Sequence, residues 1–330
     1  MSEAVLVLAV AAAILLIARA WTRAGLRDPD RRPPLPRRRM RRQFVARAMT
    51  VGGLERHCLV YVPTSLRPGR QAPLVVALHG GGGDPRSFAR MTRLHYLAER
   101  EGFLLAYPAG TGPHRARRLT WNAGGESVGW AERHRVDDVA FVRALIDDIA
   151  RFHAIDGRRI FAIGASKGGM LAYHLACTCS DVFAAVAVVA GSMVSRGCAP
   201  RAPVAVLHVH GGRDENVPLR GGRGRRTAHG NVWPPVEEGL AFWRRHNGCT
   251  GDRRETYRDA GTACWRSVGR DHGDVEFCLV ADGGHGWPGS RPGFWQWLFR
   301  VRVAGAFPTN RMAWRFFVEH PKPDAAARSR

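Results

Sequence analysis

Short, unbroken apolar runs recur along the chain, and most of them stop at glycine, proline or polar residues. The clearest runs occupy residues 74–78, 103–107, 159–163, 184–189, 204–209 and 275–280. Apolar runs of this length, without polar alternation, are typical of parallel strands that are buried on both faces. An earlier pair of strands is expected to turn at Gly52 and Gly53 and to end before Pro63.

Between the apolar runs the hydrophobic period changes to that of a helix. Residues 138–153 carry apolar side chains at helical spacing, with Asp137 placed as the N-cap. Further helices are expected over residues 167–177, 235–245 and 312–319. Strands that alternate with helices predict a succession of βαβ units. The pattern therefore indicates an α/β fold with a mostly parallel sheet and helices on both of its faces.

The first 42 residues do not follow this pattern. Residues 1–22 contain an apolar stretch, and we interpret them as a signal or membrane-anchor segment. Residues 23–42 are rich in arginine and proline and predict an extended linker, so the catalytic domain is expected at 43–330. The protein would then be exported or membrane-anchored, and an extracellular or periplasmic location is favoured. If the segment is retained, the arginines after it would instead favour a cytoplasmic-facing anchor.

The formal net charge of +22 comes almost entirely from arginine, because Lys167 and Lys322 are the only lysines. Such a charge can indicate binding to nucleic acid or to an anionic membrane. No signature of a nucleic-acid-binding module occurs in the chain, so no specific nucleic-acid partner is expected. The basic segment 23–42 would lie on anionic lipid headgroups, or would act only as a spacer.

Seven cysteines are present, and six of them lie in the second half of the chain. They are Cys58, Cys177, Cys179, Cys198, Cys249, Cys264 and Cys278. None of their spacings fits a zinc site, so no metal is expected. In an exported protein this number predicts up to three disulfides and one remaining thiol, with the pairing left open. The alternative is a set of reduced cysteines buried as small hydrophobic side chains.

The segment Gly164-Ala165-Ser166-Lys167-Gly168 matches the G-x-S-x-G pattern of a nucleophilic serine. An expected strand precedes it and an expected helix follows it, which is the context that this turn requires. The glycines leave room for a sharp turn, and the start of the helix favours negative charge near the serine. We therefore predict that Ser166 is the nucleophile of an acyl-transfer enzyme.

A nucleophilic serine needs a base, and the base needs an acid that orients it. Asp214 follows the strand at 204–209 and is the predicted acid, with its neighbour Glu215 as the alternative. His285 lies in a glycine-rich loop after the strand at 275–280 and is the predicted base. Asp214 is also followed by His229, His246 and His272, whose surroundings are typical of surface loops or helices.

Two backbone N–H groups should bind the oxyanion that forms during acyl transfer. We assign one to Lys167, directly after the nucleophile, and the other to Gly81 in the glycine-rich loop after the strand at 74–78. His79 and Gly80 are expected to shape this loop. Losing one such donor typically costs about 3 kcal/mol of transition-state stabilisation.

Taken in order, these motifs resemble the polyhydroxybutyrate depolymerase and feruloyl/acetyl-xylan esterase family of secreted α/β-hydrolases. The resemblance covers about residues 56–320. It rests on the motifs at 78–83, 136–141, 164–170, 210–214 and 284–289. It implies hydrolysis of carboxylic esters through an acyl-enzyme, without a metal or a cofactor. The family's triad falls on Ser166, Asp214 and His285.

Substrate contacts follow less directly from the sequence. Trp287, two residues after the predicted base, is placed to stack on an acyl chain, a polymer repeat or a sugar ring. Trp121 and Asn122 would line the same cleft, or simply pack in the fold. The charge of Lys167 would favour acidic or polar acyl groups. Asp137 and Asp138 are interpreted as helix-capping residues.

The resemblance leaves more than one function open. The main hypothesis is a polyhydroxyalkanoate depolymerase-like esterase that acts on a polymer, an oligomer or a small ester. The alternatives are a feruloyl or acetyl-xylan type carbohydrate esterase and a non-catalytic, membrane-tethered binding protein on a hydrolase scaffold.

Overall fold

The computed structural model describes residues 35–114, 118–125, 129–225, 230–290 and 307–323. Its centre is a ten-stranded sheet in the order β1-β2-β4-β3-β5-β6-β7-β12-β11-β10. Six adjacent strands run parallel and form the middle of the sheet. They are β4 (Leu104–Pro108), β3 (Ala72–Leu78), β5 (Ile155–Ala165), β6 (Ala185–Val189), β7 (Ala205–Gly211) and β12 (Val275–Val280). All six coincide with the predicted apolar runs.

Antiparallel strands extend the sheet at both edges. β1 (Phe44–Val51) and β2 (Leu54–Tyr61) form one edge, and β11 (Thr262–Ser267) and β10 (Arg254–Arg258) form the other. The predicted turn between β1 and β2 is present. Gly52 and Gly53 both have positive φ, at 57° and 75°, which glycine adopts without steric cost.

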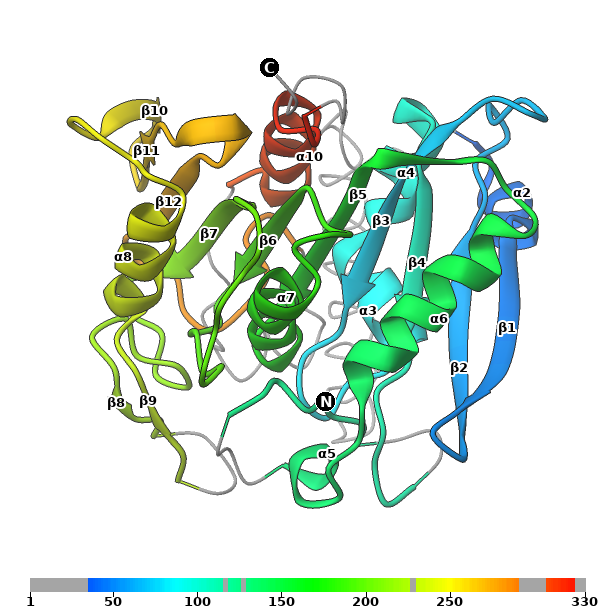
Figure 1. Cartoon of the computed structure of the whole chain (residues 1–330), viewed down its shortest axis with the longest axis horizontal. Coiled ribbons are helices and arrows are strands. Elements are labelled where there is room, and N and C mark those ends of the chain that lie inside the picture. The colour runs from blue at the N-terminus through cyan, green and yellow to red at the C-terminus, as the bar shows by residue number, and fades with distance from the viewer. Residues whose placement is uncertain (1–34, 115–117, 126–128, 226–229, 291–306, 324–330) are drawn as a thin grey trace, which may run out of the picture.

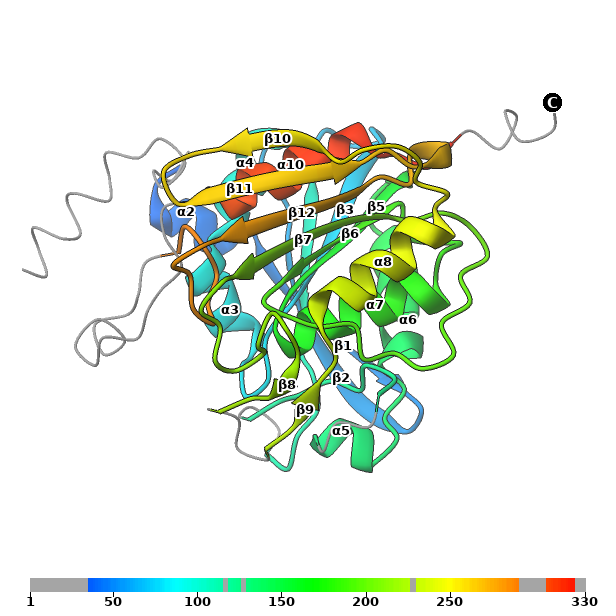
Figure 2. The same cartoon turned by 90° about the vertical axis from the view of Figure 1, so that its left-hand side faces the viewer.

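Helices cover both faces of the sheet, as Figures 1 and 2 show. One face carries α6 (Asp138–Ala150), α7 (Lys167–Thr178) and α8 (Val236–His246). The opposite face carries α3 (Pro85–Thr92), α4 (Leu94–Glu101) and α10 (Thr309–Glu319). Alternate residues of each central strand contribute to two cores. In β3, for example, Leu74 and Val76 pack on the first face and Val75 on the second.

The structure differs from the sequence prediction at several edges of the domain. The predicted linker ends in α2 (Arg37–Arg42), whose Met40 is buried in the core, so this part of it belongs to the folded domain. Phe152, expected on α6, lies beyond its end and is 60 % exposed.

The remaining short elements are α5 (Trp130–Arg133), β8 (Gly222–Arg223), β9 (Val232–Trp233) and a 3₁₀ turn at Arg270–His272.

Within the described residues, no helix is long and apolar enough to cross a membrane. The predicted signal or anchor at 1–22 and most of the linker at 23–42 lie outside the described residues. The signal or anchor and the extended linker therefore stay predictions.

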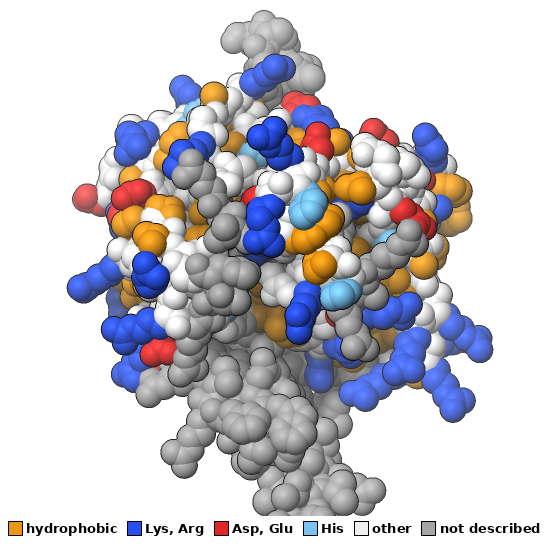
Figure 3. Space-filling model, turned by 90° about the horizontal axis from the view of Figure 1, so that it is seen from below, with side chains coloured by type: hydrophobic (Ala, Val, Ile, Leu, Met, Phe, Trp, Pro, Cys, Tyr) orange, Lys and Arg blue, Asp and Glu red, His pale blue; other side chains and the backbone are white. Residues whose placement is uncertain are grey.

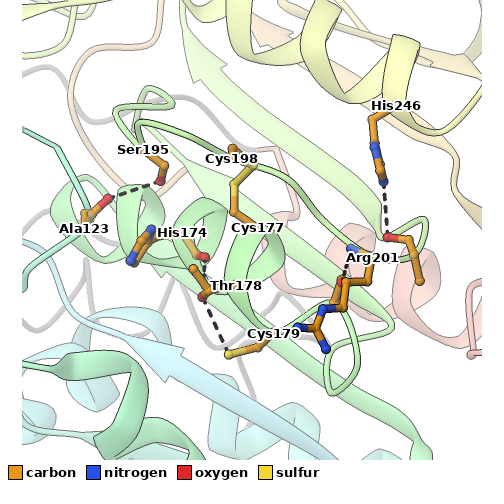
Figure 4. Close-up of a disulfide and its surroundings, with 11 residues drawn as sticks. Ala123, His174, Cys177, Thr178, Cys179, Ser195, Cys198, Arg201 and His246 are labelled. Carbon is orange, nitrogen blue, oxygen red and sulfur yellow. Dashed lines mark hydrogen bonds between the residues drawn. A yellow bond between two sulfur atoms is a disulfide. The ribbon is translucent and has the colours of Figure 1, made fainter.

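Two disulfides form among the seven cysteines. Cys264 and Cys278 join the neighbouring strands β11 and β12, and Cys177 pairs with Cys198. Figure 4 shows the second bond, which connects the last turn of α7 to the loop that carries Cys198. The other three cysteines are free thiols, and two of these, Cys58 and Cys179, are buried. The disulfide hypothesis therefore applies to four of the cysteines, and the hypothesis of reduced, buried cysteines applies to Cys58 and Cys179.

Candidate active site

Ser166 lies in a strained turn between β5 and α7, at the carboxyl end of the parallel strands. Its backbone has φ of 51° and ψ of −117°, outside the regions that a side chain normally allows. The N–H of Ser166 donates to the carbonyl of Val189 at the end of β6, at 2.8 Å. This bond fixes the turn to the sheet and places the serine, which is partly exposed, at the start of α7.

Both glycines of the motif are required by close backbone contacts. A Cβ on Gly164 would lie 2.2 Å from the carbonyl oxygen of Gly168, and a Cβ on Gly168 would lie 2.2 Å from that of Leu78. Such contacts are far below van der Waals distance, and backbone atoms cannot move aside as a flexible side chain can. The turn at Ser166 can therefore form only when these two positions have no side chain.

Asp214 follows β7, and its side chain is buried. Its Oδ1 accepts hydrogen bonds from the backbone N–H groups of Asn216 and Val217, at 2.8 and 2.9 Å. Its Oδ2 accepts one from His285 Nδ1 at 2.8 Å. Burial opposes the charge of Asp214, but the hydrogen bond from His285 and the N–H of Val217 hold its pKa below the ordinary value. The neighbouring Glu215 is exposed, so Asp214 is the acid that contacts the histidine.

Two glycine-rich loops bring Asp214 and His285 together. A Cβ on Gly211 would lie 2.4 Å from the carbonyl oxygen of Gly283, and one on Gly212 would lie 2.5 Å from that of Ala281. The loops that follow β7 and β12 therefore touch backbone to backbone. The ring of His285 uses Nδ1 for Asp214, which leaves Nε2 as the atom for proton transfer.

The other histidines considered from the sequence have different surroundings. His246 lies at the end of α8 and contacts the carbonyl of Ala202 at 3.3 Å. His272 lies in the 3₁₀ turn, and His229 is outside the described residues. Of the described histidines, His285 is the one whose ring nitrogen contacts Asp214 at 2.8 Å.

The glycine-rich loop after β3 passes beside the nucleophile. A Cβ on Gly80 would be 3.6 Å from Ser166 Cβ, and one on Gly81 would be 3.6 Å from Lys167 Cβ. The N–H of Gly82 donates to Leu119, and that of Gly83 donates to Gly80. Within the described part of the chain, the structure gives no acceptor for the N–H of Gly81. The loop therefore offers a backbone donor next to the first turn of α7, as the oxyanion prediction requires.

His79 and Trp121 hold this loop in place. His79 Nδ1 donates to the carbonyl of Gly80 at 2.8 Å, and its Nε2 accepts from the N–H of Gly110 at 3.0 Å. Burial lowers the pKa of His79 to about 4, so the ring is neutral. The indole N–H of Trp121 donates to the carbonyl of His79 at 2.8 Å. The side chain of Trp121 is 0 % exposed, so it supports the loop. The prediction that Trp121 lines a substrate cleft is therefore not met, and its packing role applies instead.

Asn122 also serves the fold. Its side chain bonds to Val136 and Gly124, and its backbone N–H donates to Asp138 Oδ2 at 2.7 Å. The second oxygen of Asp138 pairs with Arg56 at 2.6 Å in a fully buried ion pair. Asp138 therefore anchors the segment before α6, and the N-cap of α6 is Asp137, as expected.

Trp287 is a core residue as well. It is 2 % exposed, packs edge-on against Phe88 of α3 at 5.6 Å between ring centroids, and donates its indole N–H to Asn310 at 3.0 Å. The predicted stacking on a substrate is wrong for this conformation, because neither ring face is accessible. Trp287 instead fixes the loop that carries His285 to helices α3 and α10.

The side chain of Lys167 points to Glu132 of α5. The two form a buried ion pair, with the side chains 9 and 7 % exposed respectively. Burial lowers the pKa of Lys167, and Glu132 opposes this effect. Since Glu132 compensates the ammonium charge, the expected preference for acidic acyl groups does not follow from Lys167.

We expect Lys167→Met to lower the free energy of unfolding by about 3 kcal/mol, because it leaves the Glu132 carboxylate buried without its cation. Urea denaturation measures this change. The double variant Lys167→Met with Glu132→Gln is the control, and it should recover most of the loss. A double variant no more stable than the single one would show that the pair is not coupled in this way.

Comparison with known proteins agrees with the fold and with an esterase activity. The family model described as "Esterase PHB depolymerase" matches residues 58–221. "Putative esterase NocK" from Nocardia uniformis subsp. tsuyamanensis is 32 % identical over 253 residues, which are 71 % of this chain and 69 % of that protein. Feruloyl esterase B from Piromyces equi is 27 % identical over 238 residues, covering 70 % of this chain but only 42 % of its own length.

A solved structure shows the same fold. The acetyl xylan esterase from Aspergillus awamori superposes with a TM-score of 0.54 over 78 % of this chain and 98 % of its own, at 15 % identity. At this identity the likeness concerns the fold, an α/β-hydrolase, and not the substrate.

Proposed function

Because the chain belongs to the esterase PHB depolymerase family and is a serine carboxylic ester hydrolase, we propose that Ser166, Asp214 and His285 form its catalytic triad. His285 Nε2 takes the proton of Ser166 Oγ, which attacks the ester carbonyl carbon. The tetrahedral oxyanion lies between the N–H groups of Lys167 and Gly81. His285 then gives its proton to the leaving alcohol, and an acyl-enzyme remains.

Water completes the reaction by the same route. His285 removes a proton from water, the resulting hydroxyl attacks the acyl carbon, and collapse of the second oxyanion returns the proton to Ser166 Oγ. Asp214 accepts from His285 Nδ1 throughout and stabilises the imidazolium that forms in each half. The observation that carries the proposal is the 2.8 Å bond between these two residues, which follow β7 and β12 of the same parallel sheet whose β5 leads into the strained turn of Ser166.

A fluorophosphonate probe tests the proposal and separates an enzyme from a binding protein on the same scaffold. We expect one equivalent of probe to attach to Ser166, and Ser166→Ala to remain unlabelled. His285→Ala should label far more slowly, because the serine then lacks its base. Ser180→Ala, at a serine distant from the motif in sequence, is the control and should label as the parent does. Labelling that survives Ser166→Ala would contradict the assignment.

For the substrate we propose a polyhydroxyalkanoate-type ester, with feruloyl or acetyl-xylan esters as the second candidate. The family description supports the first, and the names of the relatives support the second. Figure 3 views the face below the carboxyl ends of the parallel strands, where Lys and Arg side chains are widespread and Asp and Glu are sparse. This distribution favours substrates that carry negative charge. Comparing hydroxyalkanoate oligomers with feruloyl and acetyl esters of sugars decides between the candidates.

We further propose that the protein is exported or membrane-anchored, with its basic N-terminal segment on an anionic membrane surface. The two disulfides support an oxidising compartment. In α2, all five arginines are exposed while Met40 is buried, so their charges face solvent. Sedimentation with phosphatidylserine vesicles measures the membrane contact, and equal binding to neutral vesicles would contradict it.

A further inference from the structure

Behind Asp214, three buried polar side chains form a row of hydrogen bonds that the mechanism above does not use. The Tyr173 hydroxyl lies 2.8 Å from His208 Nδ1, and His208 Nε2 lies 2.9 Å from His210 Nδ1. All three side chains are 0 % exposed. Tyr173 belongs to α7, which starts at the nucleophile, and the two histidines belong to β7, which leads to Asp214. The row therefore connects the two elements that carry Ser166 and Asp214.

The far end of the row determines where its protons are. His210 Nε2 lies 2.9 Å from the carbonyl oxygen of Val217, which can only accept, so this nitrogen must carry a proton. In a neutral ring His210 Nδ1 is then bare and accepts from His208 Nε2–H. His208 Nδ1 is bare in turn and accepts from the Tyr173 hydroxyl. In this arrangement each of these polar atoms has a partner of the right kind.

A positively charged His210 would break this arrangement. Its Nδ1 would donate to His208, whose own Nδ1–H would have to donate to the Tyr173 oxygen. The hydroxyl proton of Tyr173 would then need another acceptor, and the structure gives none among the described residues. Burial also lowers the pKa of both histidines. Asp214 opposes this effect at His210, and His285 adds to it. On the β12 side His208 faces the uncharged ring of Phe277.

The row reaches the catalytic acid through one residue. Val217 accepts from His210 through its carbonyl and donates its N–H to Asp214 Oδ1 at 2.9 Å. His210 Nε2 itself lies 3.6 Å from Asp214 Oδ2, the oxygen that His285 uses. A cation at His210 would compete with His285 for this carboxylate, whereas a neutral ring does not.

We propose that Tyr173, His208 and His210 are positioning residues that hold the turn at 214–217 through a single neutral tautomer. Because His210 is then uncharged, it does not compete with His285 for the negative charge of Asp214. This inference rests on the proposed function, because it assigns the row a role in orienting the catalytic acid. It predicts the Nε2–H tautomer for both buried rings.

Nitrogen NMR of the full chain labelled with ¹⁵N-histidine tests the tautomer. We expect His208 and His210 to show the neutral Nε2–H form from about pH 5 to 8, without titration, with His208→Gln and His210→Gln assigning the signals. A proton on Nδ1 of either ring, or titration in this range, would overturn the proposal. Because Ser166→Ala should give the same spectrum, this outcome is independent of whether the serine is the nucleophile.

Two tyrosine-to-phenylalanine variants, each of which removes one buried hydroxyl, test the catalytic part of the proposal. Tyr173→Phe removes the first donor of the row, while Tyr61→Phe removes a 2.6 Å hydrogen bond to Glu99, outside the active site. We expect kcat for a p-nitrophenyl ester to fall about tenfold in Tyr173→Phe, with KM unchanged, because Asp214 is held less firmly. Tyr61→Phe should lose stability but keep kcat. Equal kcat values in the two variants would mean that the row is structural only.

His210 offers a matched pair of substitutions. His210→Gln retains an N–H donor for the Val217 carbonyl, and His210→Leu does not. We expect kcat to be higher in the glutamine variant than in the leucine variant, with similar KM values. A leucine variant as active as the glutamine variant would contradict the positioning role.

Discussion

Ser166→Ala is expected to lower kcat for ester hydrolysis by about 10⁶-fold, as removal of the nucleophile does in other serine hydrolases. The physical reason is the loss of the acyl-enzyme route, since water must then attack the ester without a covalent intermediate. The substitution removes one oxygen from a side chain that is only partly buried, and the backbone of the turn already tolerates a Cβ. The free energy of unfolding should therefore stay close to that of the parent protein.

Initial rates with p-nitrophenyl acetate and butyrate measure this effect, and thermal denaturation checks the fold. Asp214→Asn provides a graded comparison. It keeps the shape of the side chain but no longer favours the tautomer of His285 that has its proton on Nδ1. We expect kcat to fall about 10⁴-fold. Activity that persisted in Ser166→Ala would place the nucleophile elsewhere.

Gly168→Ala is expected to lower the free energy of unfolding by more than about 4 kcal/mol, or to prevent folding. Its new Cβ would lie 2.2 Å from the carbonyl oxygen of Leu78 and 2.5 Å from that of His79, both backbone atoms at the end of β3. Relief of this overlap would require α7 to move away from the sheet, and with it Ser166 and the oxyanion donors. Soluble yield, circular dichroism and urea denaturation measure the loss.

Gly157→Ala is the matched control for this prediction. Gly157 lies in β5, the strand that leads to Ser166, and a Cβ there would have no atom within 4 Å. Alanine at this position should be neutral or slightly stabilising, because it reduces the conformational freedom of the unfolded chain. If Gly168→Ala were as stable as Gly157→Ala, the close contact of α7 with β3 would not be what requires glycine.

The central strands and the triad could be predicted because local sequence carries their signal. A strand such as β3, buried on both faces, must be apolar throughout, and the turn at Ser166 needs glycines at fixed spacing. The edge strand β10 carries no such signal. In β10, exposed and intermediate residues dominate, so its sequence does not distinguish it from a loop. Helix α3 had a usable signal in Asp84, which caps it, followed by Pro85.

The roles of the tryptophans could not be predicted, because proximity in sequence does not determine the direction of a side chain. Trp287 is two residues from His285, yet it points into the core toward Phe88.

The row of hydrogen bonds behind Asp214 could not be predicted from the sequence either. His208 and His210 lie on one face of β7 and read as part of an apolar strand, and their partner Tyr173 is 35 residues from His208. Only the packing of α7 on the sheet brings them together.

Helix α7 starts at the nucleophile and is held covalently at its other end by the bond between Cys177 and Cys198. In a reducing bacterial cytosol this bond would not form, and about 3 kcal/mol of stability would be absent. The choice of production host therefore decides which molecule is assayed. Material from the periplasm, or material refolded with a glutathione redox pair, would have the oxidised form described above, whereas cytosolic material would have a helix secured at one end.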